Sequence, residues 1–388
     1  MRMLVLGAGL QGSACAYDLL AHTEHDVVIA DQNVDAPPAF LAPYLAGGRL
    51  TAVRVDANDP EAMRRVMQGV SATMSAFPYY FNGPLASLAV EAGSHFCDLG
   101  GNTDIVLQQK QGHDRAVAGS VSVIPDCGLA PGMVNILAEH GIRQLDQTRA
   151  VRIYVGGLPQ KPQPPLNYQV VYSLEGVLDY YTTLSWVLRD GRQTQVKALS
   201  EIVELDFDGA GTLEAFHTAG GLSAMAQRYE GRIPTMEYKT LRYPGHARMM
   251  EALRELGLFD LEPVNVKGVP VVPRDMFIAA VGPKLRKDYK ESPDLVALRV
   301  EVEGTDRGEE TLLRWDLLDR YDADTGITAM MRTTGFSLAI TGTLQAEGKI
   351  KPGVWTPDEA MPAREYIAAL AERGVVIQES RVTLGALR

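Results

Sequence analysis

Three glycines near the N-terminus have the spacing of a phosphate-binding turn. Gly7, Gly9 and Gly12 follow the apolar run 3–6 in a G-x-G-x-x-G pattern, and a helical pattern begins after them. The first glycine permits a tight turn, the second lets the backbone approach a pyrophosphate, and the third lets helix and strand pack closely. The unpaired N–H groups at the start of the helix attract phosphate oxygens. The pattern therefore predicts a dinucleotide-binding site.

An acidic residue stands where such sites hold the adenosine ribose. Asp31 ends a second apolar run, 27–30, about 20 residues after the middle glycine. Gln32 and Asn33 follow it, and no Arg or Lys stands nearby in the sequence to hold a 2′-phosphate, which favours NAD over NADP. A structural glycine turn is the alternative interpretation. The strand, the helix and the acid all occupy the places that a nucleotide site requires, so we expect NAD as the cofactor.

Ligands of an open parallel sheet bind outside the carboxyl ends of its strands. We therefore expect the cofactor to touch the glycine turn and the residues that end the second, third and fourth strands. The expected cofactor-binding residues are Gly7, Gly9, Leu10, Gln11, Gly12, Asp31, Gln32, Asp56, Ala57, Ala76 and Phe77.

Further polar residues follow later strands of the same sheet. Asp98 and Asp126 are each placed to hold a cationic amine or to act as general base, and capping of the following helices is the alternative for both. Tyr79 and Tyr80 either line the nicotinamide and substrate pocket or pack under the domain junction. Cys127 reads as a small packed residue rather than a nucleophile, because nothing nearby in the sequence would lower its pKa.

The second half of the chain offers three candidate substrate contacts. Arg242 has the planar fork that grips a carboxylate with two bonds, and a surface ion pair is its alternative. His246 has an ordinary pKa suited to proton shuttling, or it simply begins a helix. Glu175 either faces an amine or is the first-turn acid of a helix capped by Ser173.

Two kinds of element must position these residues. Strands alternate with helices through the first 130 residues, which predicts an α/β fold with a doubly wound parallel sheet. Beyond that point, Asp-Gly turns at 190–191 and 208–209 and alternating polarity at 296–302 predict a mostly antiparallel α+β domain. A long apolar helix is expected over 329–346.

Composition excludes several classes of protein. The 388 residues are 46% hydrophobic and 22% charged, as in ordinary globular proteins of two domains. The net charge of −11 argues against a nucleic-acid partner. The three cysteines and seven histidines are scattered, so we expect neither a disulfide framework nor a metal site. Without a leader or an apolar run of roughly 18–20 residues, we expect a cytoplasmic protein that forms a homodimer or higher homo-oligomer.

Several strings together resemble the saccharopine dehydrogenase family, and most closely its lysine 6-dehydrogenase branch. They are the glycine turn 7–12, 77–80, 97–101 (Cys-Asp-Leu-Gly-Gly), 124–133 (ending Asp-Cys-Gly-Leu-Ala-Pro-Gly-Met), 241–246 and 332–336. The resemblance implies a Rossmann domain over 1–130, an inserted α+β substrate and dimerisation domain over 131–325, and a C-terminal segment, 326–388, that returns to the Rossmann domain.

The resemblance also implies a reaction. In this branch NAD oxidises the side-chain amine of L-lysine to allysine, which cyclises to a piperideine carboxylate, and ammonia is released. The amine must lose a proton before hydride can leave the neighbouring carbon, so a carboxylate or water must act as base. The implied catalytic residues are Asp98, Asp126 and Tyr79, and the implied substrate contacts are Tyr80, Cys127, Glu175, Arg242 and His246.

Two other functions stay open. A reductase that joins an amine to a keto acid or aldehyde, as in saccharopine or carboxyspermidine formation, would need a further arginine for a second acid, and Arg228 and Arg232 are available. A non-catalytic NAD-sensing protein would bind the nucleotide without turnover. The acids at the strand ends count against such a sensor, which has no need of them.

Overall fold

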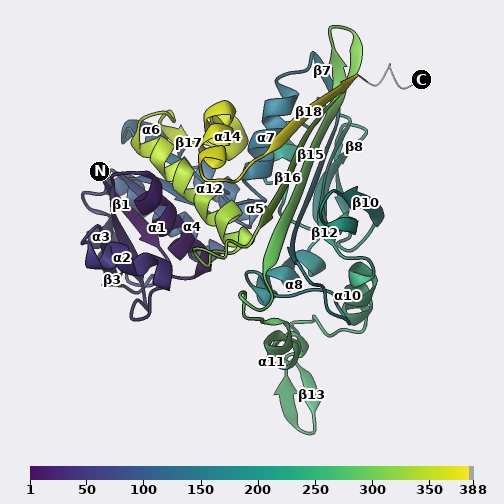
Figure 1. The fold of residues 1–388 in the computed structure, drawn as a ribbon, viewed down its shortest axis with the longest axis horizontal. Helices are drawn as coiled ribbons and strands as arrows, with labels where there is room; N and C mark the ends of the chain where they lie inside the picture. The colour runs from purple at the N-terminus through teal and green to yellow at the C-terminus, as the bar shows by residue number, and fades with distance from the viewer. Residues whose placement is uncertain (384–388) are drawn as a thin grey trace. The chain divides into compact units, whose positions relative to one another are not determined.

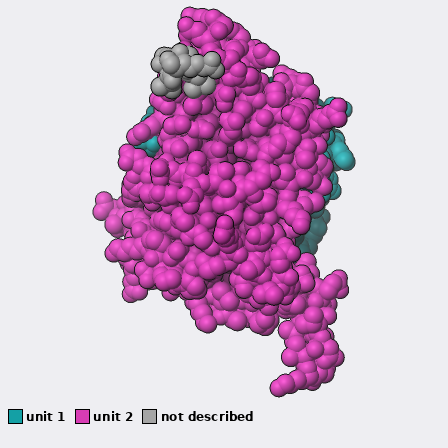
Figure 2. All heavy atoms as spheres, turned by 90° about the vertical axis from the view of Figure 1, so that its right-hand side faces the viewer, with its two compact units in different colours: residues 1–145, 223–228, 331–377 teal, residues 146–222, 229–330, 378–388 magenta. Residues whose placement is uncertain are grey.

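The computed structural model describes residues 1–383, which fall into two compact units (Figure 2). Unit 1 comprises Met1–Leu145, Ser223–Arg228 and Met331–Ile377. Unit 2 comprises Asp146–Leu222, Tyr229–Met330 and the described residues from Gln378 onward. The short segment Ser223–Arg228 therefore belongs to unit 1, although the chain on either side of it belongs to unit 2. The domain limits expected from the sequence stay a prediction.

Unit 1 is built on a parallel sheet (Figure 1) with the strand order β17-β6-β5-β4-β1-β2-β3. Strand β1, in the interior of the sheet, is wholly buried from Met3 to Leu6, as expected for a strand covered on both faces. This arrangement confirms the predicted doubly wound α/β fold. The strands are β1 Arg2–Leu6, β2 Asp26–Asp31, β3 Leu50–Arg54, β4 Ala72–Ser75, β5 His95–Asp98, β6 Ser122–Ile124 and β17 Gly353–Val354.

The helices of unit 1 lie between its strands in the chain. The stretch 103–118 forms two helices, because the chain leaves the helical path at Gln111 and Gly112, and glycine weakens a helix interior. Asn82 begins α4 without capping it, and its side chain accepts a hydrogen bond from Ser75. The helices are α1 Leu10–His22, η1 Ala39–Leu41, α2 Ala42–Ala46, α3 Pro60–Met67, η2 Tyr79–Phe81, α4 Asn82–Glu91, α5 Thr103–Lys110, α6 His113–Ala118, α7 Met133–Ile142, α9 Met225–Arg228, α12 Ala329–Ala346, α13 Pro357–Ala360 and α14 Ala363–Glu372.

Unit 2 is built on a nine-stranded sheet with the order β10-β11-β12-β7-β15-β16-β18, and β8 joins it beside β12 and pairs with β9. β7 and β12 pair in parallel, and the other pairings among its described strands are antiparallel, as predicted. Both expected Asp-Gly hairpins are present, since β8 turns into β9 and β10 into β11 there. The strands are β7 Gln147–Pro159, β8 Ser185–Arg189, β9 Arg192–Val196, β10 Val203–Phe207, β11 Gly211–His217, β12 Thr235–Arg242, β15 Asp294–Asp306, β16 Glu309–Arg320 and β18 Gln378–Thr383.

Three helices of unit 2, α8 Leu174–Thr182, α10 His246–Glu255 and α11 Pro273–Leu285, pack in a common apolar core with Phe216 of β11. A separate two-stranded ribbon, β13 Val264–Val266 and β14 Val269–Val271, lies between α10 and α11 in the chain. Within residues 1–383, no helix has both the length and the hydropathy that spanning a bilayer requires.

Candidate functional site

The glycine turn of unit 1 has the shape that a bound pyrophosphate needs. Gly7 has φ +103°, which favours glycine, and a Cβ on Gly12 would lie 1.9 Å from the Gly7 carbonyl oxygen. A Cβ on Gly9 would meet nothing within 4 Å, so the backbone there faces open space. No side chain caps α1, no acid stands in its first turn, and the amide atoms of Gln11 are buried without a partner among the described residues. The site therefore fits the phosphates of a dinucleotide.

Asp31 lies against this turn. One carboxylate oxygen accepts the Ala8 N–H at 2.8 Å, and the other accepts the Asn33 N–H at 2.9 Å. Gln32 reaches across to the next strand end, where its amide donates to the Asp56 carboxylate at 2.9 Å. These contacts bring the ends of β1, β2 and β3 into one polar edge.

A cation also lies at this edge, which the sequence did not reveal. Asp31 and Arg54 are paired in the β2–β3 register. The Arg54 guanidinium donates to the Gln32 carbonyl and, at 2.6 Å, to the Asp35 carboxylate. No arginine or lysine lies close to Asp31 along the chain, but Arg54 lies close to it in the structure. The absence of a nearby cation was therefore wrong as an argument for NAD over NADP.

The remaining expected cofactor contacts also lie at strand ends of unit 1. Ala57 follows Asp56, and Ala76 follows β4 and donates its N–H to the Leu6 carbonyl at 2.8 Å. The Phe77 ring packs beside Phe81 with centroids 6.0 Å apart. Of these positions, Ala76 lies directly against the glycine turn, because its carbonyl oxygen would be 3.1 Å from a Cβ on Gly7.

Asp98 and Asp126 form a buried pair, here called the acid pair. Asp98 accepts the Gly100 N–H at 2.7 Å on one oxygen and the Gln109 amide at 2.8 Å on the other. Asp126 accepts the Gly101 N–H at 3.2 Å, and its second oxygen accepts the Ser223 hydroxyl. Neither carboxylate caps the following helix: Asn102 caps α5, and the α7 N-terminus is held at Gly132 and Asn135.

Burial shifts the titration of the acid pair towards neutrality. Desolvation raises the pKa of Asp98 to about 6, against the opposing effect of the Gln109 and Gly100 hydrogen bonds. Desolvation also raises the pKa of Asp126 to about 7, and the nearby charge of Asp98 adds to this rise. Two carboxyl groups that titrate together near neutral pH can take up and release a proton under working conditions.

The backbone around the acid pair is tightly constrained. Asp126 has φ 61°, and a Cβ on Gly100 would lie 1.6 Å from an Asp126 carboxylate oxygen. Cys127 donates its N–H to the Asp98 carbonyl at 2.7 Å, while its buried thiol points at the Ile124 carbonyl, 3.1 Å away. This placement fits the packed role expected of Cys127.

Sequence reasoning missed Ser223. It comes from the segment Ser223–Arg228, whose last residue is held by both carboxylate oxygens of Glu139 at 3.1 Å and by Asp358. Ser223 and Asp126 lie 97 positions apart in the sequence, and no motif links them. No signal in the sequence would have found this contact.

The two candidate tyrosines lie at the surface of unit 1. Tyr79 is 37% exposed and Tyr80 is 59% exposed on η2, with ring centroids 5.8 Å apart. Neither side chain is buried, so both offer a ring face and a phenol to a ligand.

Unit 2 holds a different polar cluster, here called the arginine relay. The buried Arg242 donates from Nε to the Tyr181 hydroxyl at 3.2 Å and from Nη1 to the Leu241 carbonyl at 2.8 Å. Its guanidinium also lies 4.8 Å from the centre of the Tyr168 ring. Within residues 1–383, no carboxylate lies at ion-pair distance from Arg242, so the surface ion pair considered above is wrong. The Tyr168 hydroxyl is likewise buried without a hydrogen-bond partner among these residues.

His246 completes the relay, and its expected proton-shuttling pKa is wrong. Its Nδ1 lies 3.0 Å from the Leu166 carbonyl, which only accepts, so Nδ1 carries the hydrogen. Nε2 then accepts from the Tyr181 hydroxyl at 3.0 Å. Burial, with the charge of Arg242, lowers the pKa of His246 to about 3. The imidazole is therefore neutral and orients Tyr181, which in turn orients Arg242.

Glu175 lies exposed in the first turn of α8, where the Ser173 hydroxyl caps the Gly176 N–H at 3.2 Å. Its position agrees with the first-turn alternative, in which an acid favours the helix N-terminus.

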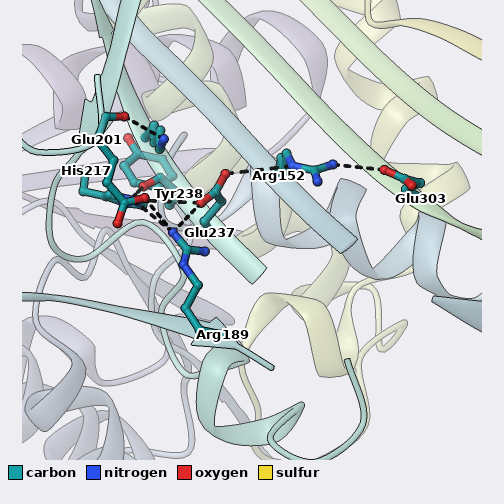
Figure 3. Close-up of polar contacts among 8 residues, drawn as sticks. Arg152, Arg189, Glu201, His217, Glu237, Tyr238 and Glu303 are labelled. Atoms are coloured by element: carbon teal, nitrogen blue, oxygen red, sulfur yellow. Dashed lines mark hydrogen bonds and ion pairs between the residues drawn. The ribbon is translucent and has the colours of Figure 1, made fainter. Parts of the chain in front are cut away.

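A second polar cluster of unit 2 contains carboxylate and imidazole side chains, which are types that can bind a metal ion. Glu201, His217 and Glu237 bring ligand atoms within 4.8 Å of one another. Figure 3 shows that the Arg189 side chain points among them, and its Nη2 donates to Glu201 at 2.9 Å and to Glu237 at 2.8 Å. Arg189 pairs with both acids, and Arg152 lies 3.9 Å from Glu237, so two cations face the two carboxylates and the geometry describes an ion-pair network.

Comparison with known families identifies the chain. Residues 3–124 match the saccharopine dehydrogenase NADP binding domain, and residues 128–375 match the saccharopine dehydrogenase C-terminal domain. The chain belongs to the saccharopine dehydrogenase family. It is therefore an oxidoreductase that acts on carbon–nitrogen groups in amino-acid metabolism with a nicotinamide dinucleotide.

Two of the similar proteins match nearly the whole chain, and a third matches about two thirds of it. Saccharopine dehydrogenase (NADP+, L-glutamate-forming) of Schizosaccharomyces pombe is 23% identical over 454 residues, covering 97% of this chain and 98% of that protein. Alpha-aminoadipic semialdehyde synthase of Arabidopsis thaliana is 24% identical over 274 residues, which cover 65% of this chain and 24% of that protein. Apo saccharopine dehydrogenase (L-Glu forming) of Saccharomyces cerevisiae matches the fold with a TM-score of 0.80 at 19% identity, covering 98% and 100% of the two chains.

Within this saccharopine dehydrogenase family member, the nucleotide-binding match contains the glycine turn, Asp31, Arg54 and Asp98. The acid pair spans its end, because Asp126 lies just beyond residue 124. The roles of the individual site residues stay predictions.

Proposed function

We propose that this member of the saccharopine dehydrogenase family oxidises the side-chain amine of L-lysine, giving allysine and ammonia. The observation that carries the proposal is Arg242, a buried guanidinium in unit 2 with no carboxylate of its own among the described residues. A buried charge is costly unless it is paired, so a ligand carboxylate is a fitting partner for it.

The relay prepares Arg242 to hold one carboxylate. Tyr181 and the Leu241 carbonyl fix the guanidinium plane, and the unpartnered Tyr168 hydroxyl supplies a further donor beside it. A planar guanidinium binds a carboxylate with two parallel bonds, which sets its orientation as well as its affinity. The α-carboxylate of an amino acid is a ligand of this kind.

Two arginines, Arg228 and Arg232, are candidates for binding a second acid group of a substrate, and neither is a buried arginine without a carboxylate partner. Arg228 is held by Glu139 and Asp358 within unit 1. Arg232 is exposed, and its guanidinium lies over the Tyr229 ring at 5.0 Å. With only one unneutralised buried arginine described in unit 2, a substrate with a single carboxylate is favoured over one that carries a second acid.

Asp126 is the proposed base. A lysine side-chain amine is protonated below about pH 10, and hydride leaves the adjacent carbon only after the nitrogen has lost its proton. With a pKa of about 7, Asp126 is ionised at alkaline pH and can accept that proton. Asp98 acts as a positioning residue, because its carboxylate and carbonyl hold Gly100, Gln109 and the N–H of Cys127.

The remaining steps balance. A bound nicotinamide nucleotide would supply the acceptor for the hydride. The substrate carbon that loses the hydride would form a double bond to nitrogen, and water would add to this carbon and displace ammonia, leaving the aldehyde. Tyr79 and Tyr80, exposed on η2, are proposed to line the nicotinamide and substrate pocket, and Tyr79 offers its phenol to the reacting nitrogen.

NAD is the proposed cofactor. The carboxylate of Asp31 beside the glycine turn suits ribose hydroxyls and repels a 2′-phosphate, and Arg54 is already paired with Asp35. The family domain carries NADP in its name, so the two nucleotides need direct comparison.

A second candidate is formation or cleavage of saccharopine. It is supported by the Schizosaccharomyces pombe relative, which matches this chain along 97% of its length. That reaction joins the lysine side chain to a second acid, for which the described arginines of unit 2 offer less support.

One panel separates these functions. Reduced nucleotide formation is measured at alkaline pH with lysine, ornithine, diaminopimelate, saccharopine and diamines, with NAD and NADP in parallel. Lysine oxidation with NAD alone is the expected result. Turnover only with saccharopine, or only in the reductive direction with a keto acid, would establish the second candidate. Nucleotide binding without turnover on any substrate would indicate a non-catalytic sensor.

A further inference from the structure

Unit 1 contains a cavity lined by residues of α4, α5 and α6. Its volume is about 170 Å³, below the roughly 300–1,000 Å³ of sites that take drug-sized molecules, so it suits a smaller ligand. Ala86 and Val90 stand four residues apart on the side of α4 that lines the cavity. Val123 and Val354, neighbours in the β6–β17 register, add buried apolar walls. The lining residues differ from those of the glycine turn and of the acid pair.

The polar part of the lining is rich in amides and carries one charge. Gln108, Gln109 and Gln111 supply three amide groups, and Arg115 supplies the positive charge. Among the described residues, no acid lines the cavity. An anion is therefore favoured there over a cation.

Gln109 is the buried polar residue of the lining, with 6% of its surface exposed. Its Nε2 donates to the Asp98 carboxylate at 2.8 Å, which fixes the amide nitrogen on that side and leaves Oε1 on the other. Oε1 is buried and has no hydrogen-bond partner within the part of the chain that the structure describes. An unpaired buried carbonyl oxygen is costly, so a ligand that donates a hydrogen bond to Oε1 is favoured.

Arg115 lies exposed at the cavity, beside Gln109. A Cβ on Gly112 would lie 3.7 Å from the Arg115 Nη2 and 3.2 Å from the Gln109 carbonyl oxygen, so one small molecule can reach both residues. No described acid lies at ion-pair distance from this guanidinium, which leaves it available to a carboxylate. An ammonium as the donor to Oε1 would be repelled by Arg115 with no acid to balance it, so a neutral hydroxyl suits this position better.

We propose that this cavity binds the anion of a small hydroxy acid. Its carboxylate pairs with the Arg115 guanidinium, and its hydroxyl donates to the Gln109 Oε1. The apolar walls cover its carbon chain, while the exposed Gln108 and Gln111 offer further amide contacts. The ligand then stands one amide away from the acid pair, because Gln109 also bonds to Asp98.

A matched series of ligands tests the proposal on the full chain, with binding followed by saturation-transfer NMR. Lactate carries both groups, whereas propionate lacks the hydroxyl, lactamide lacks the charge, and alanine carries an ammonium in place of the hydroxyl. Lactate is expected to bind about 10-fold more tightly than each of the other three, because each of them loses one of the two contacts. Equal affinities for lactate and propionate, tighter binding of alanine, or no saturable binding of lactate would overturn the proposal.

Variants distinguish this cavity from the carboxylate site proposed at Arg242. Arg115→Gln is expected to weaken lactate binding about 10-fold. Arg65→Gln changes an exposed arginine of α3 outside the cavity, and this matched control is expected to leave lactate binding unchanged. Equal effects of the two variants would show that lactate binds elsewhere.

A third variant tests the hydroxyl contact. Gln109→Leu removes the acceptor, so lactate should then bind no more tightly than propionate, while the affinity for propionate stays unchanged. A preference for lactate that survives in Gln109→Leu would contradict the assigned contact. Because Arg115 is exposed, Arg115→Gln still tests the site if Gln109→Leu fails to fold.

Discussion

The acid pair of unit 1 and the arginine relay of unit 2 are both buried, and each is unbalanced in charge. Asp98 and Asp126 accept hydrogen bonds from neutral groups, namely backbone N–H groups, Gln109 and Ser223. Arg242 donates to a neutral phenol and a carbonyl. The acid pair thus lacks a cationic partner, and the arginine relay lacks an anionic one, among the described residues.

The two clusters accommodate this imbalance differently. The acids titrate, since burial raises the pKa of Asp98 to about 6 and of Asp126 to about 7. A guanidinium cannot lose its proton in this way, so Arg242 stays charged and its aromatic neighbours hold it. On the proposed function, proton transfer belongs to unit 1 and carboxylate recognition to unit 2. That one amino-acid substrate meets both clusters stays a prediction.

Removing the proposed base should have the largest effect. Asp126→Asn keeps the side-chain size but cannot accept the proton, so kcat is expected to fall about 10²- to 10⁴-fold. Nucleotide affinity, measured by titration of cofactor fluorescence, is expected to stay unchanged. Asp98→Asn should also lower turnover far more than nucleotide affinity. Equal losses of turnover and affinity would show that the acid pair only supports the fold of unit 1.

The relay should instead determine substrate affinity. Arg242→Lys keeps the charge but loses the two-bond geometry, and hydrogen bonds to charged groups are worth about 1.5–3 kcal/mol. The KM for lysine should therefore rise about 10- to 100-fold with kcat less affected. Arg232→Lys, on the exposed guanidinium over Tyr229, is the matched control and should leave KM unchanged. A KM for lysine that moves with Arg232 instead would place carboxylate recognition elsewhere.

The sequence was most informative where the relevant physics is local. A strand, three glycines and a helix stand next to one another in the chain, and in the structure Gly7 has a φ of +103°, which favours glycine, while a Cβ on Gly12 would clash with the Gly7 carbonyl oxygen. The helix predicted over 329–346 is α12, because a long apolar helical pattern needs no distant partner to be recognised.

The sequence could not predict contacts and pKa shifts that depend on strand register or on burial. Arg54 reaches Gln32 because β2 and β3 pair with Asp31 beside it. Ser223 reaches Asp126 from a segment that leaves the surrounding unit 2 chain. The ordinary pKa expected for His246 was wrong, because the residues next to His246 in the sequence do not reveal that it is buried beside Arg242.

Ser223 offers a smaller change that sharpens the role of Asp126. Its hydroxyl bond favours the charged carboxylate and so lowers the pKa of Asp126 against the effect of burial. Ser223→Ala should therefore raise this pKa, by up to about one unit for a bond worth about 1 kcal/mol. The acid limb of the kcat profile should move to higher pH, while activity at pH 9.5, about 2.5 units above the folded pKa of about 7, is largely kept. A uniform loss at every pH would mean that Ser223 acts on structure alone.

The smallest effect concerns stability, where the two clusters should have opposite pH dependence. A carboxyl group whose pKa is raised by folding stabilises the folded state fully at a pH below its unfolded pKa of about 3.9. This stabilisation is lost as the pH rises through the folded pKa values of about 6 for Asp98 and about 7 for Asp126. His246, whose pKa is lowered to about 3 by folding, stabilises the folded state fully above its unfolded pKa of about 6.5, and this stabilisation is lost as the pH falls towards 3. In urea unfolding between pH 4 and 8, Asp98→Asn/Asp126→Asn should remove a decline of stability towards high pH, and His246→Gln should remove a decline towards low pH. If both variants changed the slope in the same direction, the opposite pKa shifts assigned to the acid pair and to His246 would be wrong.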